Sequence, residues 1–266
     1  MATADLLLKA AGQTVIITGA ANGIGAETAR LFLQHGANVV IADLPASRSA
    51  AEDLIATLSP DRAIFIPVDI LVWSDMLTLF KKTKEIFGRI DIVIANAGIM
   101  ESQHLFHIPT DPNNNDDPIE PKEHHKVIDI NLKGTLNTLT LAMHHLKSQP
   151  PLPNSSSLSH RGSVLLIIST SGYFGGSGVM AYVASKHGIT GLLRACQKEA
   201  QRKGVRVNAV APYFTPTHMT GEFAQRWREE GLPANTALDV ATAVAGTALD
   251  EGLEGKTILV SLARAT

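Results

Sequence analysis

The chain is poor in several features that mark particular classes of protein. It has one cysteine, Cys196, so no internal disulfide can hold the fold. No apolar run approaches the roughly 18 residues that a membrane-spanning helix needs. The amino terminus also lacks the basic segment and long apolar core of a secretory signal. We therefore expect a cytoplasmic protein with no membrane partner.

The chain also lacks a large excess of positive or negative charge. The 23 Lys and Arg residues nearly balance the 25 Asp and Glu residues, and the basic residues are scattered along the chain. Without a basic stripe we expect no nucleic-acid partner. No HExxH or Cys/His spacing accompanies the adjacent pairs His124-His125 and His144-His145, and neighbours on a helix point in different directions, so we expect no metal site.

What the sequence does contain is an alternation of short apolar strands and helical patterns. Its 266 residues and 45% hydrophobic content suit one α/β domain over residues 1–266. Runs rich in Val and Ile indicate strands buried on both faces, and the lengths between them suit right-handed crossovers. We expect a single-domain Rossmann fold, a doubly wound parallel sheet of about seven strands flanked by helices, with strands at 14–17, 38–42, 63–67, 90–95, 163–169, 205–210 and 257–260.

A glycine loop follows the first strand. Gly19, Gly23 and Gly25 have the spacing GxxxGxG and lead into a helical pattern. Gly19 permits a tight turn, Gly23 lets the backbone approach a pyrophosphate, and Gly25 allows the helix to pack closely on the strand. The N-terminus of the helix would offer unpaired N–H groups to the phosphates of a dinucleotide. A glycine turn without a ligand is the alternative.

The second strand ends in Asp43, eighteen positions after Gly25. A carboxylate at this place can accept hydrogen bonds from both hydroxyls of an adenosine ribose, and it would repel the 2′-phosphate of NADP. No Arg or Lys stands at position 20, 21, 22 or 44 to neutralise that phosphate. We predict NAD as the cofactor, with NADP less favoured because Arg48 could fold back. A capping residue at a strand end is the other interpretation of Asp43.

The segment Tyr182-Val183-Ala184-Ser185-Lys186 places a phenol and an ammonium four residues apart, on one face of a helix. A nearby cation favours the phenolate, so the pair could exchange a proton near neutral pH. Taken alone, an exposed helical Tyr and Lys would explain the spacing equally well.

With these motifs in order, the chain resembles the short-chain dehydrogenase/reductase family over nearly its whole length. The resemblance implies a catalytic tetrad of Asn131, Ser169, Tyr182 and Lys186. Tyr182 would exchange the alcohol proton, Lys186 would lower its pKa, and Ser169 would hold the substrate oxygen. Ser169 is chosen over Ser171 because the family serine lies thirteen positions before the tyrosine. Asn131 would interrupt its helix and hold a water that links Lys186 to solvent.

The same resemblance implies the cofactor contacts. The loop TGAANGIG would bind the phosphates, Asp69-Ile70 the adenine, and the NAG sequence at Asn96 would steady the central sheet beneath the nicotinamide. The full set of predicted cofactor-binding residues is Gly19, Asn22, Gly23, Ile24, Gly25, Asp43, Asp69, Ile70, Asn96, Ala97, Gly98, Tyr182, Lys186, Pro212, Thr215 and Thr217.

Two departures from the family pattern concern the substrate. Tyr213 follows Pro212 where most relatives have glycine, and the carboxyl-terminal EGLEGKTILVSLARAT is similar to the 15-hydroxyprostaglandin dehydrogenase branch, which oxidises secondary alcohols with NAD. Residues 213–233 supply apolar side chains, so we predict a substrate loop with an apolar lining; an amphipathic packing helix is the alternative. These side chains are Phe214, Met219, Phe223 and Trp227.

The predicted function is an NAD-dependent oxidoreductase that interconverts a hydrophobic secondary alcohol and its ketone, both small molecules. An NAD-using epimerase or other redox-neutral enzyme, and a non-catalytic NAD-binding partner protein, remain as alternatives. His104 and His107 are candidate substrate contacts, because they follow the strand that ends at the crevice of the sheet.

Two stretches look inserted and are expected to be exposed loops. Residues 148–161 are expected to lie away from the chemistry, whereas 110–118 lie either at a substrate entrance or clear of it. The apolar helices predicted at 127–146 and 181–200 resemble those that pair across a two-fold axis in the family. We therefore predict a homodimer or homotetramer.

Overall fold

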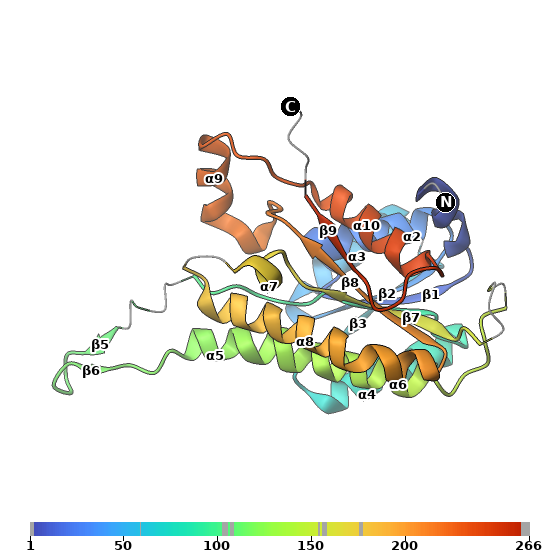
Figure 1. Ribbon diagram of the computed structural model, residues 1–266, viewed down its shortest axis with the longest axis horizontal. Helices are drawn as coiled ribbons and strands as arrows, with labels where there is room; N and C mark the ends of the chain where they lie inside the picture. The colour runs from blue at the N-terminus through green and yellow to red at the C-terminus, as the bar shows by residue number, and fades with distance from the viewer. Residues whose placement is uncertain are drawn as a thin grey trace.

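A computed structural model describes residues 3–58, 60–102, 106, 109–153, 155, 159–175 and 178–261. Seven strands form one parallel sheet in the order β3-β2-β1-β4-β7-β8-β9 (Figure 1). All seven expected strands are present, with ends that differ by no more than two residues. They are β1 (Thr14–Thr18), β2 (Asn38–Asp43), β3 (Ala63–Pro67), β4 (Ile92–Ala95), β7 (Gly162–Ile167), β8 (Val205–Pro212) and β9 (Thr257–Val260).

Helices cover both faces of the sheet (Figure 1). Alternate strand residues point to opposite faces, so Val15 and Ile17 of β1 join one buried core while Ile16 joins the other. The first face carries α1 (Thr3–Leu7), α2 (Gly23–Gln34), α3 (Arg48–Leu58) and α10 (Ala237–Leu249). The second carries α4 (Trp73–Phe87), α5 (Lys122–Ile128), α6 (Thr135–Leu146) and α8 (Met180–Arg202). Both faces are thus covered, as an all-parallel sheet requires.

Short helical elements complete the chain. Three turns are 3₁₀ helices, Leu8–Ala10, Pro45–Ser47 and His218–Thr220. Two further helices, α7 (Ser171–Phe174) and α9 (Gly221–Glu229), follow β7 and β8 and lie at the carboxyl edge of the sheet (Figure 1).

The strand order reverses between β1 and β4, which pair directly. The connections on the two sides of this point run in opposite directions, and sheets of this kind bind their ligands in a crevice at the carboxyl ends of the strands there. The predicted site residues occupy this edge. Gly19 follows β1, Asp43 ends β2, Asn96 follows β4, Ser169 follows β7, and Pro212 ends β8.

The helix that contains Asn131 is interrupted, as predicted. Residues Asp129–Gly134 form a π-helical segment between α5 and α6. Such wider turns inside α-helices are frequent at functional sites, because they turn one side chain out of the regular helical register.

The first inserted stretch forms a small hairpin rather than a structureless loop. Its strands are β5 (Thr110–Asp111) and β6 (Asp117–Pro118), which pair antiparallel. Asn115 and Asp116 at the turn both have φ of 56°, a left-handed conformation that Asn and Asp tolerate well. The hairpin extends away from the sheet (Figure 1), and its part in a substrate entrance stays a prediction.

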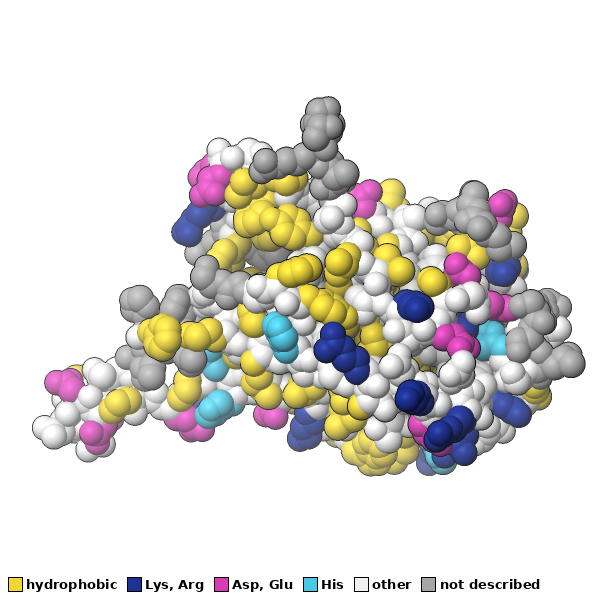
Figure 2. Space-filling view, viewed as in Figure 1, with side chains coloured by type: hydrophobic (Ala, Val, Ile, Leu, Met, Phe, Trp, Pro, Cys, Tyr) yellow, Lys and Arg dark blue, Asp and Glu magenta, His cyan; other side chains and the backbone are white. Residues whose placement is uncertain are grey.

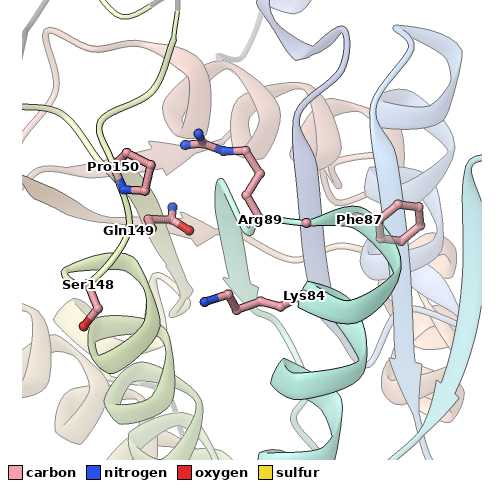
Figure 3. A pocket seen from close by; sticks show the side chains of 7 residues that line it. Lys84, Phe87, Arg89, Ser148, Gln149 and Pro150 are labelled. Atoms are coloured by element: carbon pink, nitrogen blue, oxygen red, sulfur yellow. The ribbon is translucent and has the colours of Figure 1, made fainter.

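The second inserted stretch is only partly exposed, which corrects the expectation. Gln149 and His160 are only 5% and 6% exposed. The Gln149 side chain donates hydrogen bonds to the carbonyls of Ile90 and Arg161. His160 accepts a hydrogen bond from Arg206 Nε (3.0 Å). These contacts lie at the amino edge of the sheet, where side chains of 84–89 and 148–150 line a shallow pocket (Figure 3). The described part of this stretch is therefore opposite the crevice.

Candidate active site

Contacts between β1, β4 and α2 hold the glycine loop in place. Asn96 Nδ2 donates to the carbonyl oxygens of Thr18 and Gly19, each at 2.9 Å. Gly19 has φ of 64°, and a Cβ atom there would lie 2.8 Å from Cα of Ala97. A Cβ atom at Gly25 would overlap the carbonyl oxygen of Gly19. Glycine is therefore required at both positions, and the Asn96 side chain holds the loop through its two hydrogen bonds.

Substituting Gly25 by Ala tests this packing. The added methyl group would force the loop away from α2, which we expect to cost about 1–3 kcal/mol of stability and to weaken NAD binding by at least ~10-fold. Calorimetric titration and thermal unfolding measure the two effects. Gly191→Ala is the matched control, because a Cβ atom at this α8 position meets nothing within 4 Å. A Gly25→Ala chain with parental NAD affinity would contradict the assigned role.

The loop fits the phosphates of a dinucleotide. Asn22 is the N-cap of α2, yet no side chain caps this helix end, so N–H groups of the first turn are available to an anion. Ile24, in that turn, packs against the core. Thr217 lies beside the loop, since its Cβ is 3.4 Å from the place a Cβ of Gly23 would take. The structure thus brings Thr217 to the glycine loop, 194 positions away in the sequence.

Asp43 is fixed at the end of β2 by three hydrogen bonds. Its carboxylate accepts from the backbone N–H of Ala21 (2.9 Å) and Leu44 (2.8 Å) and from Ser47 Oγ (3.1 Å). Arg48 does not contact this carboxylate. Its guanidinium donates to Glu52 (3.1 Å) and lies over the ring of Phe65, 5.1 Å from the centroid.

Asp69 and Ile70 have clear structural roles as well as their predicted adenine contact. Asp69 Oδ1 accepts from the N–H of Leu71 (2.9 Å), which shapes the turn after β3. The carbonyl of Ile70 accepts from Asn137 Nδ2 (2.9 Å), and the Ile70 side chain fills the space over Gly134. This pair therefore ties the turn to the helix that contains Asn131.

Ser169, Tyr182 and Lys186 come together at the ends of β7 and β8. The phenol of Tyr182 is hydrogen-bonded to Ser169, whose Oγ accepts from the N–H of Ser171 (3.1 Å). Lys186 Nζ lies 5.4 Å from the centroid of the Tyr182 ring and donates to the carbonyl of Ile167 (2.9 Å). The structure brings together the three predicted residues that would act on a substrate oxygen.

The protonation of this group differs from the expectation. Burial raises the pKa of Tyr182, and the carboxylate of Glu101 raises it further, whereas the hydrogen bond from Ser169 lowers it. Burial also lowers the pKa of Lys186 to about 8. Lys186 lies over the face of the ring and donates to a carbonyl, and the lowering of the phenol pKa by its charge stays a prediction.

Asn131 is fully buried, and its side-chain amide makes two hydrogen bonds with the backbone of one residue. Its Oδ1 accepts from the N–H of Ile99 and its Nδ2 donates to the carbonyl of Ile99, both at 2.8 Å. Nδ2 also donates to Ser185 (2.9 Å). Lys186 is close but not bonded, because both side chains approach Gly98, where a Cβ would lie 3.0 Å from Asn131 Oδ1 and 3.7 Å from Lys186 Nζ. The water that the resemblance implies stays a prediction.

Glu101 is a residue of the site that the sequence analysis missed. Its side chain is 1% exposed, and its carboxylate accepts from the backbone N–H of Ala181 (2.8 Å) and Tyr182 (3.0 Å). The signal was present in the sequence: an ionisable residue directly follows the apolar Gly98-Ile99-Met100, six residues after the end of the buried strand β4.

In the segment that follows β8, residues 213–233, some aromatic side chains pack on one another and other apolar side chains are exposed. Trp227 stacks on Phe214 at 4.3 Å and meets Tyr213 edge-on at 5.9 Å. Tyr213 has no positive φ, so it takes the usual glycine position without strain. Met219 and Phe223 are each 43% exposed, and apolar side chains gather around α9 in Figure 2.

Two more predicted cofactor contacts lie in this segment. The carbonyl of Pro212 accepts from the N–H of Thr170 (3.0 Å), and Thr215 is 6% exposed with its hydroxyl bonded to the carbonyl of Tyr213. His104 and His107 lie outside the described residues. In the described part of the chain, no helix has the length and apolar character needed to cross a membrane.

Comparisons with known proteins agree with this geometry. A family model described as short chain dehydrogenase matches residues 13–227. The short-chain dehydrogenase/reductase ascJ of Acremonium egyptiacum is 33% identical over 256 residues, which are 95% of this chain and 79% of that protein. Among solved structures, 3-hydroxyacyl-CoA dehydrogenase type-2 from Mycobacterium avium is similar with a TM-score of 0.79, 27% identity and 94% coverage of both chains. Levodione reductase is similar with a TM-score of 0.77, 25% identity and coverage of 94% of this chain and 96% of its own.

Proposed function

Because the chain belongs to the short-chain dehydrogenase/reductase family and is an enzyme that oxidises or reduces at CH–OH groups, we propose that it transfers hydride between NAD and a hydrophobic secondary alcohol or its ketone. The hydrogen-bonded Tyr182 and Ser169, with Lys186 against the ring, carry the proposal. They place an acid or base and a hydrogen-bond donor at one point of the crevice.

NAD is proposed over NADP on the contacts of Asp43. This carboxylate would accept ribose hydroxyls, and a 2′-phosphate at the same place would meet its charge. Arg48 is paired with Glu52 and stacked on Phe65, so it is not poised to neutralise that phosphate. The glycine loop and the N-terminus of α2 would hold the pyrophosphate, and Lys186 the nicotinamide ribose.

The mechanism follows from what each side chain can hold or move. In alcohol oxidation, Ser169 donates a hydrogen bond to the substrate oxygen and Tyr182, as phenolate, takes the hydroxyl proton. In ketone reduction, the Tyr182 phenol returns that proton to the oxygen. Lys186 stabilises the phenolate through its positive charge. NAD, when bound, supplies the chemistry of accepting or delivering the hydride.

A hydrophobic substrate is proposed from the apolar side chains beside the site. Met219 and Phe223 on the segment after β8, and Phe174 at 75% exposure on α7, leave apolar surface on elements that follow β7 and β8 at the carboxyl edge of the sheet. Names of similar proteins point in the same direction, since one is a levodione reductase and another a 3-hydroxyacyl-CoA dehydrogenase. The carboxyl-terminal resemblance to the 15-hydroxyprostaglandin dehydrogenase branch stays a prediction.

A screen of hydrophobic alcohols with NAD and NADP, and of ketones with NADH and NADPH, tests the proposed function through the absorbance of the reduced nicotinamide. We expect net turnover of an apolar secondary alcohol or ketone with the NAD pair. Product formation without any net change in NADH would instead favour an epimerase or other redox-neutral reaction.

Assembly is proposed from the helices on the second face. There α5, α6 and α8 lie side by side (Figure 1), and Leu136 on α6 is 44% exposed. In a two-fold dimer the same surface of each subunit meets its own copy, so one face formed by neighbouring helices can supply the whole interface. Light scattering should therefore give at least twice the chain mass of 28.3 kDa.

The assembly prediction has a matched pair of variants. Leu136→Glu should shift the protein toward the monomer, because a charge would be buried at the interface. Leu8→Glu, at a 72% exposed position near the amino terminus, should leave the mass unchanged. A parental protein that stays monomeric across micromolar concentrations would remove the proposal.

A further inference from the structure

The first turn of α8 carries Tyr182 and is capped by a side chain from a distant part of the chain. The N-cap residue of this helix, Val179, has no side chain that can cap it. The carboxylate of Glu101 takes that place and accepts from the N–H of Ala181 at 2.8 Å and of Tyr182 at 3.0 Å. Glu101 thus anchors the catalytic helix at the residue that carries the phenol.

Burial makes the charge of this cap matter. Glu101 is 1% exposed, and no Lys, Arg or His forms an ion pair with it within the part of the chain that the structure describes. The N-terminal end of α8 stabilises the carboxylate through its backbone N–H groups. This carboxylate lies beside Tyr182, where little solvent screens a charge.

Other charged and titratable groups surround the same turn. Lys186 of α8 lies against the Tyr182 ring, and the Asn131 amide on the π-helical segment is neutral. Elements packed on α8 add the side chains of Tyr173 on α7, of Asp129 and Lys133 on the π-helical segment, and of Lys122, Glu123, His124, His125 and Lys126 on α5. Glu101 is the carboxylate whose charge adds to burial, the larger cause, in raising the pKa of the Tyr182 phenol.

We propose that Glu101 is a positioning residue for the reaction: it fixes the first turn of α8, and its charge sets the pH range over which Tyr182 gives up its proton. The inference rests on the proposed role of Tyr182 as acid and base. A carboxylate at this place holds the phenol protonated until higher pH and so favours ketone reduction at a given pH, while Lys186 and the positive nicotinamide oppose it.

The sign of the pH effect follows directly. A negative neighbour disfavours the phenolate and raises the pKa of Tyr182. Oxidation needs the phenolate, so its rate rises with pH through that pKa. Replacing Glu101 by Gln removes the charge and keeps an acceptor oxygen. The oxidative limb of kcat/KM should then move to lower pH, by on the order of one pH unit.

Two readouts separate this effect from a purely structural one. The chain has three tyrosines, so ring-carbon NMR of ¹³C-labelled tyrosine follows the titration of Tyr182 without catalysis, and Tyr182→Phe assigns the signal. The pH profile of alcohol oxidation, in the presence of saturating NAD, is the second readout. Glu101→Asp keeps the charge and should keep the parental pH profile, with a lower melting temperature because the cap is shorter.

Glu123→Gln is the matched control. This carboxylate binds the N–H (3.0 Å) and hydroxyl (2.8 Å) of Ser102, the residue next to Glu101. Its substitution removes a charge from the same region without touching the first turn of α8. We expect the Tyr182 titration and the oxidative limb to stay in place.

The expected result is a downward shift of both the NMR titration and the oxidative limb in Glu101→Gln alone. If neither moves in a folded variant that binds NAD, the proposal is overturned. If the titration of Tyr182 moves and the oxidative limb does not, Glu101 acts on the phenol but not on the reaction, and the proposed role of Tyr182 falls with it.

Discussion

Replacing Tyr182 by Phe is expected to lower kcat by at least ~10²-fold while cofactor affinity changes little. The substitution keeps the ring against Lys186 and removes only the hydroxyl that is bonded to Ser169. The loss should therefore fall on proton transfer rather than on binding. Steady-state kinetics on the substrate found by the screen, with calorimetric titration of NAD, separate the two quantities.

Two further variants help to interpret this result. Lys186→Ala should damage both turnover and NAD binding, because the ammonium faces the phenol and is proposed to hold the nicotinamide ribose. Tyr173→Phe is the matched control: it also removes a hydroxyl, one bonded to Thr257 at 2.7 Å, and should leave kcat close to the parental value. Near-parental turnover in Tyr182→Phe would show that another group is the acid and base.

NAD is expected to bind about a hundredfold more tightly than NADP. The 2′-phosphate would lose the hydrogen bonds of Asp43 and meet its negative charge, which together amount to roughly 3 kcal/mol. Calorimetric titration of the same preparation with both cofactors measures the ratio. Asp43→Asn, which removes the charge and keeps an acceptor, should reduce the difference in affinity between NAD and NADP.

Arg48 decides what a contrary result would mean. In the structure its guanidinium is held by Glu52 and Phe65. Equal or tighter binding of NADP would show that Arg48 leaves these partners to reach the phosphate. Arg48→Ala would then restore the preference for NAD, whereas it should have little effect if Asp43 alone governs the choice.

The strands were predictable because each is a short run of Val, Ile and Ala between turn residues. In β1, β4 and β7 every residue is buried, so the apolar runs carry no polar alternation that would suggest a different architecture. The first and last residues of the strands were harder to predict. Ile90 belongs to the apolar run but precedes β4, because its backbone N–H and carbonyl bond to the side chain of Gln149 rather than to a neighbouring strand.

The site was predictable where a motif is local and not where contacts join distant segments. Glycine spacing located the loop, and the Tyr182–Lys186 spacing located one face of α8. Glu101 was missed because its partners lie 80 positions further along the chain. The raised pKa of Tyr182 in the chain alone was not predicted for the same reason, since a sequence shows Lys186 nearby but not the burial or the carboxylate that raise this pKa.

The inserted stretches show the limit of composition as a guide. Both are rich in turn-forming residues, which indicates exposure but cannot reveal individual anchors. Gln149 is polar and yet buried, because its amide satisfies the carbonyls of Ile90 and Arg161. Such a residue is recognised only when the backbone groups that it satisfies are brought to it by the fold.

The π-helical segment at Asp129–Gly134 also restricts how the gene for this chain can change length. A π turn holds about one residue more than an α turn, and each residue advances a helix by about 100°. A one-residue deletion here would restore a regular α-helix and leave Leu139 and Ala142 facing the sheet, but it would remove the wider turn that holds Asn131 against the backbone of Ile99. The deletion that makes the helix regular is thus one that would displace a residue of the candidate site, and we expect lineages of this protein to keep the length of this segment while the hairpin at 110–118 varies.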